Sequence, residues 1–319
     1  MSQYLNVKRI EFEVTYRCNS HCKHCQVEEA KRLSTPAAID RGLAMDIVRQ
    51  VTQVYHPSSI MTFGGEPLLY PDVVCAIHEM ATACGILHRS IITNAGVPRT
   101  EAQARDVAHR LAKSGVNGIW ISVDAFHQEQ IPLEIVKRNV RTYLDASIPR
   151  LVWNPCWVVS MEDDNSYNRR SRAVLDALAH LPVEMSEGNL LQPDGNAQKW
   201  LDAYLPPKTP MPAGSCQDVP YGGKLDEIDC IGIEPDGSVS ICYDWSIGNA
   251  ATDDILEVLE SYDPYAIPEA KAILEGGVAA LAELCRARNI EPDADGYYSI
   301  CHMCTSLRRS VSSLASGGG

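Results

Sequence analysis

The stretch VKRIEFEVTYRCNSHCKHC, residues 7–25, joins a strand-like run to a loop with three cysteines. Residues 7–14 alternate apolar and polar side chains, which predicts a β-strand with one buried face. Cys18, Cys22 and Cys25 follow within eight residues, at spacings of x3 and x2. This arrangement predicts three sulfur atoms close together at the end of the first strand.

Outward from this stretch, the first 190 residues alternate short apolar runs with longer helical patterns. The predicted strands are residues 7–14, 59–63, 87–93, 118–123, 151–159 and 183–190. The predicted helices are residues 36–54, 71–84, 98–114, 132–146 and 167–180, and four of the five begin with proline, which suits a first helical turn. Because βαβ crossovers are right-handed and give parallel neighbours, we predict an α/β fold, a partial (βα)6 TIM-like barrel.

A proline-rich stretch, PPKTPMPAG at residues 206–214, interrupts this pattern and predicts a linker. Beyond it, the turn triplet PDG at residues 235–237 separates two alternating runs, which predicts a β-hairpin over residues 231–241. Residues 253–261 and 268–288 have helical periodicity. We therefore expect three parts, a barrel domain (residues 1–204), a small hairpin-plus-helix domain (205–309) and a flexible tail (310–319).

The composition argues against several classes of partner. Asp and Glu number 41 against 28 Lys and Arg, so the formal net charge of -13 does not attract nucleic acid or anionic lipid. No run of 18 apolar residues occurs, and Lys8 and Arg9 stand where a signal peptide would be apolar. We predict a cytoplasmic protein with no nucleic-acid partner and no membrane association. In a reducing compartment, the grouping of eight of the 12 cysteines near the two ends indicates metal binding.

The cysteine loop favours an iron-sulfur cluster. Three thiolates this close can hold three corners of one iron-sulfur cube, which leaves the fourth iron open. The alternatives are a zinc site completed by His21 or His24, and reduced cysteines without a ligand. The position favours the cluster, because the loop follows a barrel strand at the edge where α/β barrels have their active sites.

A second motif, Gly64-Gly65-Glu66-Pro67, follows the second predicted strand. Two glycines let a ligand approach the backbone, and Glu66 offers an acceptor for a cationic amine. The same residues are also typical of an ordinary strand-to-helix turn. Its place beside the cysteine loop favours a ligand site.

The CxxxCxxC loop after the first strand and the GGE turn after the second resemble the signature of radical S-adenosylmethionine (SAM) enzymes, over roughly residues 8–190. The resemblance implies that Cys18, Cys22 and Cys25 hold a [4Fe-4S] cluster whose open iron chelates SAM. Reductive cleavage of SAM would then release a 5'-deoxyadenosyl radical. An electron donor of the flavodoxin or ferredoxin type is implied as well.

The resemblance also implies where SAM binds. The GGEP turn would hold the methionine amine, and His24 stands at a position that is often aromatic and near the adenine in relatives. Two further strand ends, Thr93-Asn94 and Ser122-Val123-Asp124, match positions that bind methionine and ribose, although Ser122 and Asp124 are equally typical strand-end caps. The implied cofactor-binding residues are His24, Gly64, Gly65, Glu66, Pro67, Thr93, Asn94, Ser122 and Asp124.

A second cysteine group lies beyond the linker, where Cys242 ends the hairpin and a CxxC pair follows at residues 301–304. This pattern resembles the Twitch or SPASM extension of radical SAM enzymes. The dense cysteine run of the full SPASM form does not follow, so the resemblance implies one auxiliary [4Fe-4S] cluster; a four-cysteine zinc ribbon is the alternative. The remaining ligand is Cys216 or Cys230, and we favour Cys216. The predicted metal ligands are therefore Cys18, Cys22, Cys25, Cys216, Cys242, Cys301 and Cys304.

Three further residues are candidate catalytic residues. Cys230, in a predicted strand, is either a packed core thiol or a hydrogen-atom donor. Cys156, in the fifth predicted strand, faces either the barrel or the outer helices. His127 follows the fourth strand, where it either moves a proton or touches substrate, or else bonds only local backbone.

From these residues we expect an enzyme that abstracts a hydrogen atom from its substrate. Relatives with such extensions often modify peptides or proteins, which implies crosslinking, epimerisation or oxidation of a peptide side chain or backbone. One alternative is a dehydrogenase of a small alcohol or sugar-like molecule. Another, of a different class, is a zinc-binding interaction protein without enzymatic activity.

Overall fold

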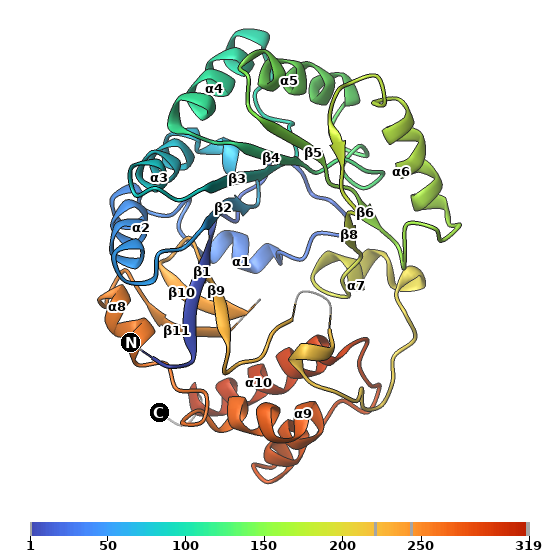
Figure 1. Ribbon diagram of the computed structural model, residues 1–319. Coiled ribbons are helices and arrows are strands. Elements are labelled where there is room, and N and C mark those ends of the chain that lie inside the picture. Colours follow the sequence, from blue (N-terminus) through green and yellow to red (C-terminus); the bar gives the residue numbers. More distant parts are fainter. Residues whose placement is uncertain (1, 220–221, 243–244, 317–319) are drawn as a thin grey trace.

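The computed structural model describes residues 2–219, 222–242 and 245–316. One curved nine-stranded sheet organises these residues, in the order β11-β10-β9-β1-β2-β3-β4-β5-β7. Figure 1 shows the sheet bent around an open centre, with helices α2 to α6 on its outer side. The curvature places the ends of strands that are far apart in the sequence around one common space.

Six parallel strands form the barrel part of the sheet. They are β1 (Leu5–Thr15), β2 (Ser59–Gly64), β3 (His88–Thr93), β4 (Gly118–Ile121), β5 (Arg150–Trp153) and β7 (Glu184–Met185). The outer helices are α2 (Arg41–Tyr55), α3 (Pro71–Ala83), α4 (Glu101–Ser114), α5 (Leu133–Asp145) and α6 (Ser166–Asp176). The predicted α/β fold, an open parallel barrel of six units, is confirmed.

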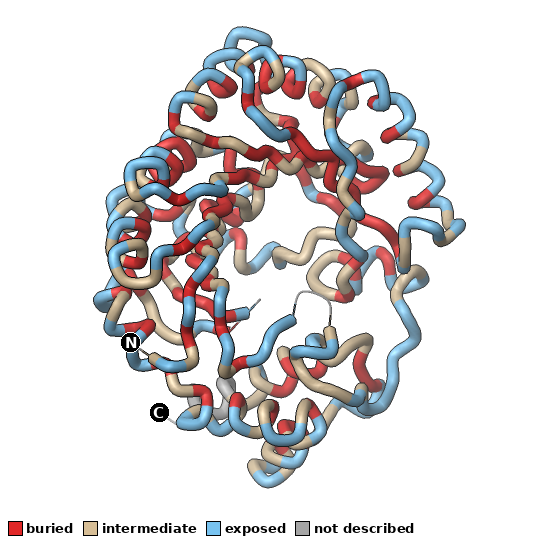
Figure 2. The backbone as a smooth tube through the Cα atoms, viewed as in Figure 1, coloured by how far each residue is buried: buried red, intermediate tan, exposed pale blue. Residues whose placement is uncertain are grey.

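The alternation in β1 explains how the strand sits in the barrel. Ile10, Phe12 and Val14 are fully buried in the hydrophobic core. Successive side chains of a strand point to opposite faces, so Glu11 and Glu13 lie on the other face, toward the inside of the barrel. Figure 2 shows the same division, with buried residues concentrated along the sheet and the inward faces of the helices.

Two predicted strands are wrong in their length, because each is interrupted. Residues 151–159 divide into β5 and β6 (Cys156–Trp157), and residues 183–190 divide into β7 and β8 (Asn189–Leu190). Pro155 has no N–H to donate to a strand partner, and Gly188 has a positive φ of 81°. Beyond these interruptions β6 and β8 pair with each other in a separate two-stranded parallel sheet.

Most predicted helix starts are also displaced. Among the five predicted barrel helices, only α3 has its predicted proline, Pro71, as its first residue; beyond the barrel, α9 also begins at its predicted proline, Pro268. Helix α2 begins five residues late, after Asp40, whose side chain accepts a hydrogen bond from the backbone N–H of Leu43. Helix α4 begins after Thr100, which forms a capping box with Gln103. Side-chain caps therefore decide these helix starts more than proline does.

The C-terminal third extends the barrel sheet. The predicted hairpin is confirmed as β9 (Ile228–Ile233) and β10 (Ser238–Cys242), and β11 (Trp245–Asn249) adds to it. Strand β9 pairs in parallel with β1, with Cys230 opposite Arg9. The helices of this part are α8 (Ile255–Glu260), α9 (Pro268–Arg286) and α10 (Ile300–Ser316). The division between residues 204 and 205 into two domains stays a prediction.

The flexible tail predicted at residues 310–319 stays a prediction. Residues 310–316 continue α10, while 317–319 lie outside the described residues. The helix is held by its own buried face, in which Met303, Cys304 and Leu307 pack into the core beside α9. Small residues in the sequence hid this anchored helix.

Five short segments complete the secondary structure of the described residues. Helix α1 (Glu29–Ser34), which the sequence reading missed, follows the cysteine loop, and α7 (Asn196–Trp200) follows β8. Single 3-10 turns occupy Pro67–Leu69, Asp202–Tyr204 and Cys216–Asp218.

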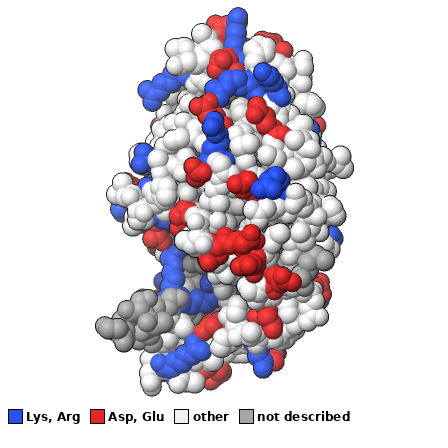
Figure 3. Space-filling model, turned by 90° about the vertical axis from the view of Figure 1, so that its left-hand side faces the viewer, with Lys and Arg blue, Asp and Glu red and all other residues white. Residues whose placement is uncertain are grey.

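None of the helices among the described residues combines the length and the apolar composition that a membrane span requires. Figure 3 shows acidic side chains gathered near the middle of one face, in agreement with the net charge of -13.

Candidate active site

A cavity of about 410 Å³ lies at the carboxyl ends of the barrel strands. It collects residues from the loops after β1, β2, β3 and β4, which the parallel sheet brings to one edge. Twelve of the residues singled out in the sequence line it: Cys18, Cys22, His24, Cys25, Gly64, Gly65, Thr93, Asn94, Ser122, Asp124, His127 and Cys156. The predicted convergence of these motifs on one strand-end site is therefore present.

The two glycines after β2 are required by the close approach of the cysteine loop. The backbone N–H of Gly65 donates to the carbonyl of Thr15 at 2.6 Å, and that of Glu66 donates to the carbonyl of Arg17 at 2.9 Å. A Cβ at Gly64 would collide with the Thr15 carbonyl, and one at Gly65 with the Arg17 carbonyl. The GGEP turn thus holds the start of the cysteine loop through backbone contacts that only glycine allows.

Each thiol of the cysteine loop has a polar neighbour. Ser20 Oγ lies 3.0 Å from the Sγ of Cys22, and Arg32 donates to the Sγ of Cys25 at 3.0 Å. The Asn94 amide donates to the Sγ of Cys18 over 3.7 Å. Hydrogen bonds to sulfur are one of the means by which a protein stabilises and tunes an iron-sulfur cluster.

The protonation of the thiols agrees with metal ligation. Burial raises the pKa of Cys18 to about 11 and that of Cys22 to about 12. Two buried thiolates without a metal are therefore unfavourable, whereas coordination removes the proton outright. The three sulfur atoms and their donors fit an iron-sulfur cluster with one iron left open.

Histidine ligation, the basis of the zinc alternative, has less support. His21 is exposed, and its backbone N–H donates to the side chain of Gln130 at 2.8 Å. His24 lies 4.7 Å from Phe126 and 4.8 Å from His127, measured between ring centroids. The ring of His24 thus belongs to a cluster with residues after β4.

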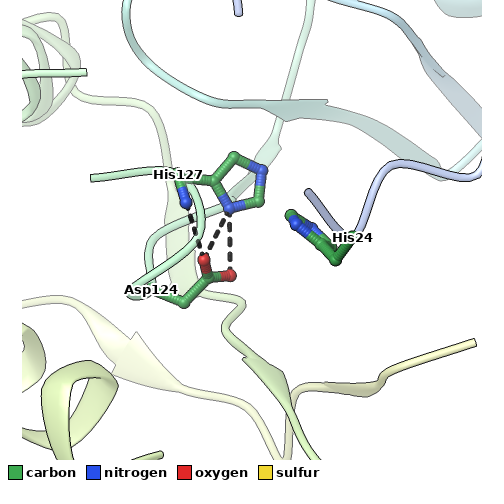
Figure 4. Close-up of side chains that lie close together, drawn as sticks. All are labelled: His24, Asp124 and His127. Carbon is green, nitrogen blue, oxygen red and sulfur yellow. Dashed lines mark hydrogen bonds and ion pairs between the residues drawn. The ribbon is translucent and has the colours of Figure 1, made fainter. Parts of the chain in front are cut away.

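That cluster consists of His24, Asp124 and His127 (Figure 4). One ring nitrogen of each histidine and one carboxylate oxygen of Asp124 lie within 4.8 Å of one another, close enough to bind one metal ion together. Both oxygens of Asp124 lie 2.9 Å from His127 Nδ1. Asp124 Oδ1 also accepts the backbone N–H groups of Phe126 and His127, and Oδ2 accepts that of Cys156, all at 2.9 Å. The carboxylate therefore fixes the loop after β4, the His127 ring and the start of β6 together.

The charges in this cluster follow from its geometry. Burial works to raise the pKa of Asp124, but the neighbouring His127 outweighs it and holds that pKa well below its usual range. Burial likewise works to lower the pKa of His127, and Asp124 raises it above its ordinary value. Burial lowers the pKa of His24 to about 4, so this ring is neutral and stacks against a charged dyad.

Glu66 has a different environment from the one expected of an amine acceptor. It is fully buried, and Oε1 accepts from the Leu68 N–H at 3.0 Å and from Thr93 Oγ1 at 2.8 Å. Its Oε2 accepts from the Asn94 N–H at 2.8 Å. Burial raises the pKa of Glu66 to about 7 against these hydrogen bonds. In this structure Glu66 ties the end of β2 to the end of β3, with Pro67 buried next to it, and a ligand role for either residue stays a prediction.

The two candidate hydrogen-atom donors are in different places. Cys156 is buried and lines the cavity, and burial, with Asp124 nearby, raises its pKa far enough that it stays a neutral thiol. Cys230 is not among the described residues that line the cavity. It faces Arg9 and Glu11 lower in the barrel, where burial raises its pKa to about 12. The structure brings only the first of these thiols to the strand-end site.

The C-terminal cysteines come from three separate elements. Cys216 lies in the 3-10 turn of residues 216–218, Cys242 at the end of β10, and Cys301 and Cys304 at the start of α10. Burial raises the pKa of Cys216 to about 12, and the charges of the other three cysteines add to this effect. The charges of Cys304, Cys242 and Cys301 thus affect the pKa of Cys216. The pKa of Cys230 is affected instead by Glu11 and Arg9.

Two contributors to the site had no signal in the sequence pattern. Asn196, at the start of α7, donates its backbone N–H to the Cys25 carbonyl at 2.9 Å and its side chain to the Cys22 carbonyl at 3.1 Å. Arg32, on α1, donates to the Ser20 carbonyl as well as to Cys25. Glu13 of β1 also lines the cavity. Its place in the alternating strand indicates a polar residue on the face opposite the buried side chains.

The fold and the site define a class, an open α/β barrel with a three-cysteine loop at the carboxyl edge of its first strand. Residues 12–167 match the sequence model described as the Radical SAM superfamily. The chain thus contains a radical SAM domain, and such a domain implies a [4Fe-4S] cluster and SAM as cofactors.

The chain is also similar to several known proteins. It is 31% identical over 131 residues to a GTP 3',8-cyclase of Picosynechococcus sp., which covers 40% of this chain and 36% of the relative. It is 29% identical over 127 residues to molybdenum cofactor biosynthesis protein 1 of Dictyostelium discoideum, covering 39% and 19%. The match thus spans little more than a third of the first relative's length and about a fifth of the second's.

Among solved structures, native anSMEcpe with bound AdoMet covers 81% of this chain and 81% of its own, with a TM-score of 0.51 and 14% identity. At this identity the likeness supports the fold alone.

Proposed function

We propose that this enzyme binds SAM in the strand-end cavity, beside a [4Fe-4S] cluster on Cys18, Cys22 and Cys25, and abstracts a hydrogen atom from a peptide or protein substrate. The observation that supports this most is the meeting of four strand-end motifs around one cavity. When bound, the cluster supplies the electron for reductive cleavage of SAM. 5'-Deoxyadenosine is the product that forms when the 5'-deoxyadenosyl radical takes a hydrogen atom, so its formation reports the reaction.

The chain's own residues prepare this site. Arg32, Ser20 and Asn94 direct polar groups at the three sulfur atoms, which supports their anionic form. The GGEP turn lets the cysteine loop pack directly against the end of β2, which fixes the loop at the edge of the cavity. The ring of His24 lies on the cavity wall and packs at a tilt against the buried ring of Phe126.

A peptide substrate is supported by the neutral polar lining. Gln26, Asn154, Asn189 and Gln192 contribute four side-chain amides to the cavity. Amides offer both donors and acceptors, which match the groups of a peptide backbone. For the same reason they would also suit the hydroxyl groups of a sugar-like alcohol, the alternative substrate.

The names of the relatives favour a second candidate, cyclisation of GTP. A triphosphate requires several cations, because its charge must be neutralised when it leaves water. The described residues that line the cavity include a single Lys or Arg, Arg32, and it is engaged with Cys25 and the Ser20 carbonyl. This lining supports a peptide over a nucleotide.

Cys156 is the proposed hydrogen-atom donor if the reaction is an epimerisation. The thiol would transfer its hydrogen atom to the substrate carbon radical, which leaves a sulfur radical on Cys156. One electron from a reductant of the flavodoxin or ferredoxin class and one proton from solvent would then restore the thiol. The position of Cys156 in the cavity supports this role, and it supports it for Cys156 rather than for Cys230.

We further propose that Cys216, Cys242, Cys301 and Cys304 hold one auxiliary [4Fe-4S] cluster. Their mutual electrostatic influence supports a shared site. A cluster with four protein ligands has no open iron, so its role would be to pass or accept electrons rather than to bind SAM.

The first experiment tests the activity. Anaerobically reconstituted protein with dithionite and SAM is expected to form 5'-deoxyadenosine, measured by mass spectrometry. A Cys18→Ala/Cys22→Ala/Cys25→Ala variant is the matched control and is expected to form none. Wild-type protein that forms no 5'-deoxyadenosine would contradict the proposal.

A second experiment separates the substrate classes. The same mixture is incubated with GTP or with a defined peptide library in deuterated water, and all products are analysed by mass spectrometry. We expect GTP to be recovered unchanged and peptides to gain deuterium or lose hydrogen. Conversion of GTP to a cyclised product would instead support the second candidate.

A further inference from the structure

One carboxyl group in the cavity has no role in the site described so far. Glu13 lies on β1, on the face opposite the buried Phe12 and Val14, and it lines the cavity. Two strands, β2 and β3, separate β1 from β4, whose following loop carries Asp124 and His127. It precedes the cysteine loop by five residues and is not one of the proposed cluster ligands.

The charged groups around Glu13 are engaged with other partners. Arg9 forms an ion pair with Glu11 at 2.6 Å. Lys31 of α1 forms one with Glu234, in the turn after β9, at 3.0 Å. Among the residues that the structure describes, no Lys, Arg or His forms an ion pair with Glu13.

The nearest donor to Glu13 is also shared. The hydroxyl of Tyr16 lies within hydrogen-bonding reach of Glu13 and donates to Glu234 Oε2 at 2.7 Å. A phenol has one proton to donate, so it satisfies one of the two carboxylates at a time. Glu234 forms an ion pair with Lys31 in addition, whereas Glu13 forms none among the described residues.

Among the described residues that line the cavity, Glu13 is therefore the one acidic group without an ion pair. Its other carboxylate, Asp124, is paired with His127, and its single Lys or Arg, Arg32, is engaged with the cysteine loop. Burial raises the pKa of Glu13 to about 7, with Tyr16 and Lys31 opposing this change and Glu234 and Glu11 adding to it. A cation in the cavity would stabilise the ionised form of Glu13, because a buried charge is costly only while it is unpaired.

We propose that Glu13 anchors a protonated amino group of the substrate. This inference rests on the proposed function, because it assumes that the substrate occupies the same cavity as SAM. It narrows the substrate class to amine-bearing molecules, in a peptide a lysine side chain or a free N-terminus, and it excludes polyanionic nucleotides. The amides of Asn154, Asn189 and Gln192 would then bind the uncharged remainder.

Binding of the amine depends on pH with a defined sign. Ionised Glu13 pairs with an ammonium group, and protonated Glu13 does not. For a lysine side chain, which stays protonated in this range, affinity is therefore expected to rise as the pH increases through about 7. The titratable and charged groups that face Glu13 are Tyr16 and Glu11 of its own segment, Lys31 of α1 and Glu234 of the hairpin turn.

The test is affinity selection with mass spectrometry on the full reconstituted chain in the presence of SAM. The probes are a defined pool of tripeptides with free amino groups and the same pool after complete acetylation of those groups. We expect wild-type protein to retain the free amines over their acetylated partners by at least roughly tenfold at pH 8. Retention is expected to fall between pH 8 and pH 6.

Two variants distinguish a specific effect of Glu13 from a general effect of negative charge inside the barrel. Glu13→Gln is expected to bring the retention ratio to about one and to remove its pH dependence. Glu11→Gln, which alters the neighbouring carboxylate paired with Arg9, is expected to keep both. Circular dichroism of each variant checks that the fold is intact, and Glu13→Asp, which keeps the charge, is expected to restore part of the selectivity.

Several results would overturn the inference. These are equal or absent retention of both pools by the wild type, undiminished selectivity in Glu13→Gln, or equal loss in both Gln variants. A parallel loss of SAM affinity in Glu13→Gln would also overturn it, because the anchored amine would then be that of SAM. Failure of the proposed function shows separately, as the lack of 5'-deoxyadenosine from wild-type protein.

Discussion

The two cysteine groups of this protein are built in opposite ways. Cys18, Cys22 and Cys25 belong to one loop after β1, and each thiol has a polar neighbour on the protein. The second group is assembled from a 3-10 turn, a strand end and a helix start that are up to 88 residues apart, counted from Cys216 to Cys304. The first site is therefore local in sequence, and the second exists only once the C-terminal third has folded.

The surroundings of the two groups differ as well. The first group lines the cavity, next to the turns after β2 and β3. In the second group Cys242 and Cys301 are exposed, and the largest effect of neighbouring charge on Cys216 comes from Cys304. This contrast agrees with the roles proposed above, the binding of SAM at the first group and a supporting redox role for the second.

The strongest test of this contrast removes one group at a time. Replacing Cys18, Cys22 and Cys25 by alanine is expected to abolish formation of 5'-deoxyadenosine and to lower the iron content from about eight to about four per chain. Replacing Cys216, Cys242, Cys301 and Cys304 is expected to lower iron equally but to leave SAM cleavage without substrate measurable. Iron and sulfide analysis with product assays checks both, and equal loss of SAM cleavage in the two variants would contradict the division of roles.

A narrower test concerns the fourth ligand of the second group. Cys216→Ala is expected to lose about four irons per chain, whereas Cys230→Ala is expected to keep them, because Cys230 lies beside Arg9 and Glu11. Iron analysis and low-temperature electron paramagnetic resonance of the reduced proteins measure the difference. Loss of iron in Cys230→Ala alone would reverse the assignment.

The local group was predictable from the sequence because spacing fixes it. Three cysteines within eight residues cannot lie far apart, and the alternation in residues 7–14 locates the strand before them. The convergence of the GGEP turn with this loop followed from the parallel sheet, which brings the carboxyl ends of neighbouring strands to one edge.

The dispersed features were not predictable in the same way. The choice between Cys216 and Cys230 depends on the pairing of β9 with β1, and no local pattern encodes that pairing. The break of residues 151–159 into β5 and β6 depends on Pro155 and on the bond from Cys156 to Asp124. Tertiary contacts also hold α10, whose small residues resemble a tail.

The third prediction concerns the dyad that joins the loop after β4 to the cavity. Asp124→Asn keeps the shape but removes the charge paired with His127, so a loss of about 3 kcal/mol in the free energy of unfolding is expected. The raised pKa of His127 contributes stability that is present below pH 6.5 and is lost as the pH rises through the raised value. The lowered pKa of Asp124 contributes stability above its unfolded pKa, about 3.9.

Urea denaturation between pH 4 and pH 9 measures this effect. The difference between wild type and Asp124→Asn is expected to be largest between about pH 4 and 6.5 and to shrink at higher pH. A matched control is Asp163→Asn, an acidic residue in the loop before α6, which is expected to show no such pH dependence. A difference that is constant across the range would mean that the backbone hydrogen bonds of Asp124, and not its charge, carry its contribution.

The smallest expected effect concerns the ion pair that joins helix α1, after the first cysteine group, to the β9–β10 hairpin, whose second strand ends at Cys242 of the second group. Lys31, on the helix after the cysteine loop, pairs with Glu234 of the hairpin and lies 4.5 Å from the ring centroid of Tyr16. Because Lys31 is partly exposed, solvent screens the pair, and Lys31→Met is expected to cost about 1 kcal/mol or less in the free energy of unfolding. Both iron contents should remain unchanged. A double-mutant cycle with Glu234→Gln at low and high salt isolates the coupling, which should shrink with salt, and a coupling of several kcal/mol would show that the two regions fold as one unit through this pair.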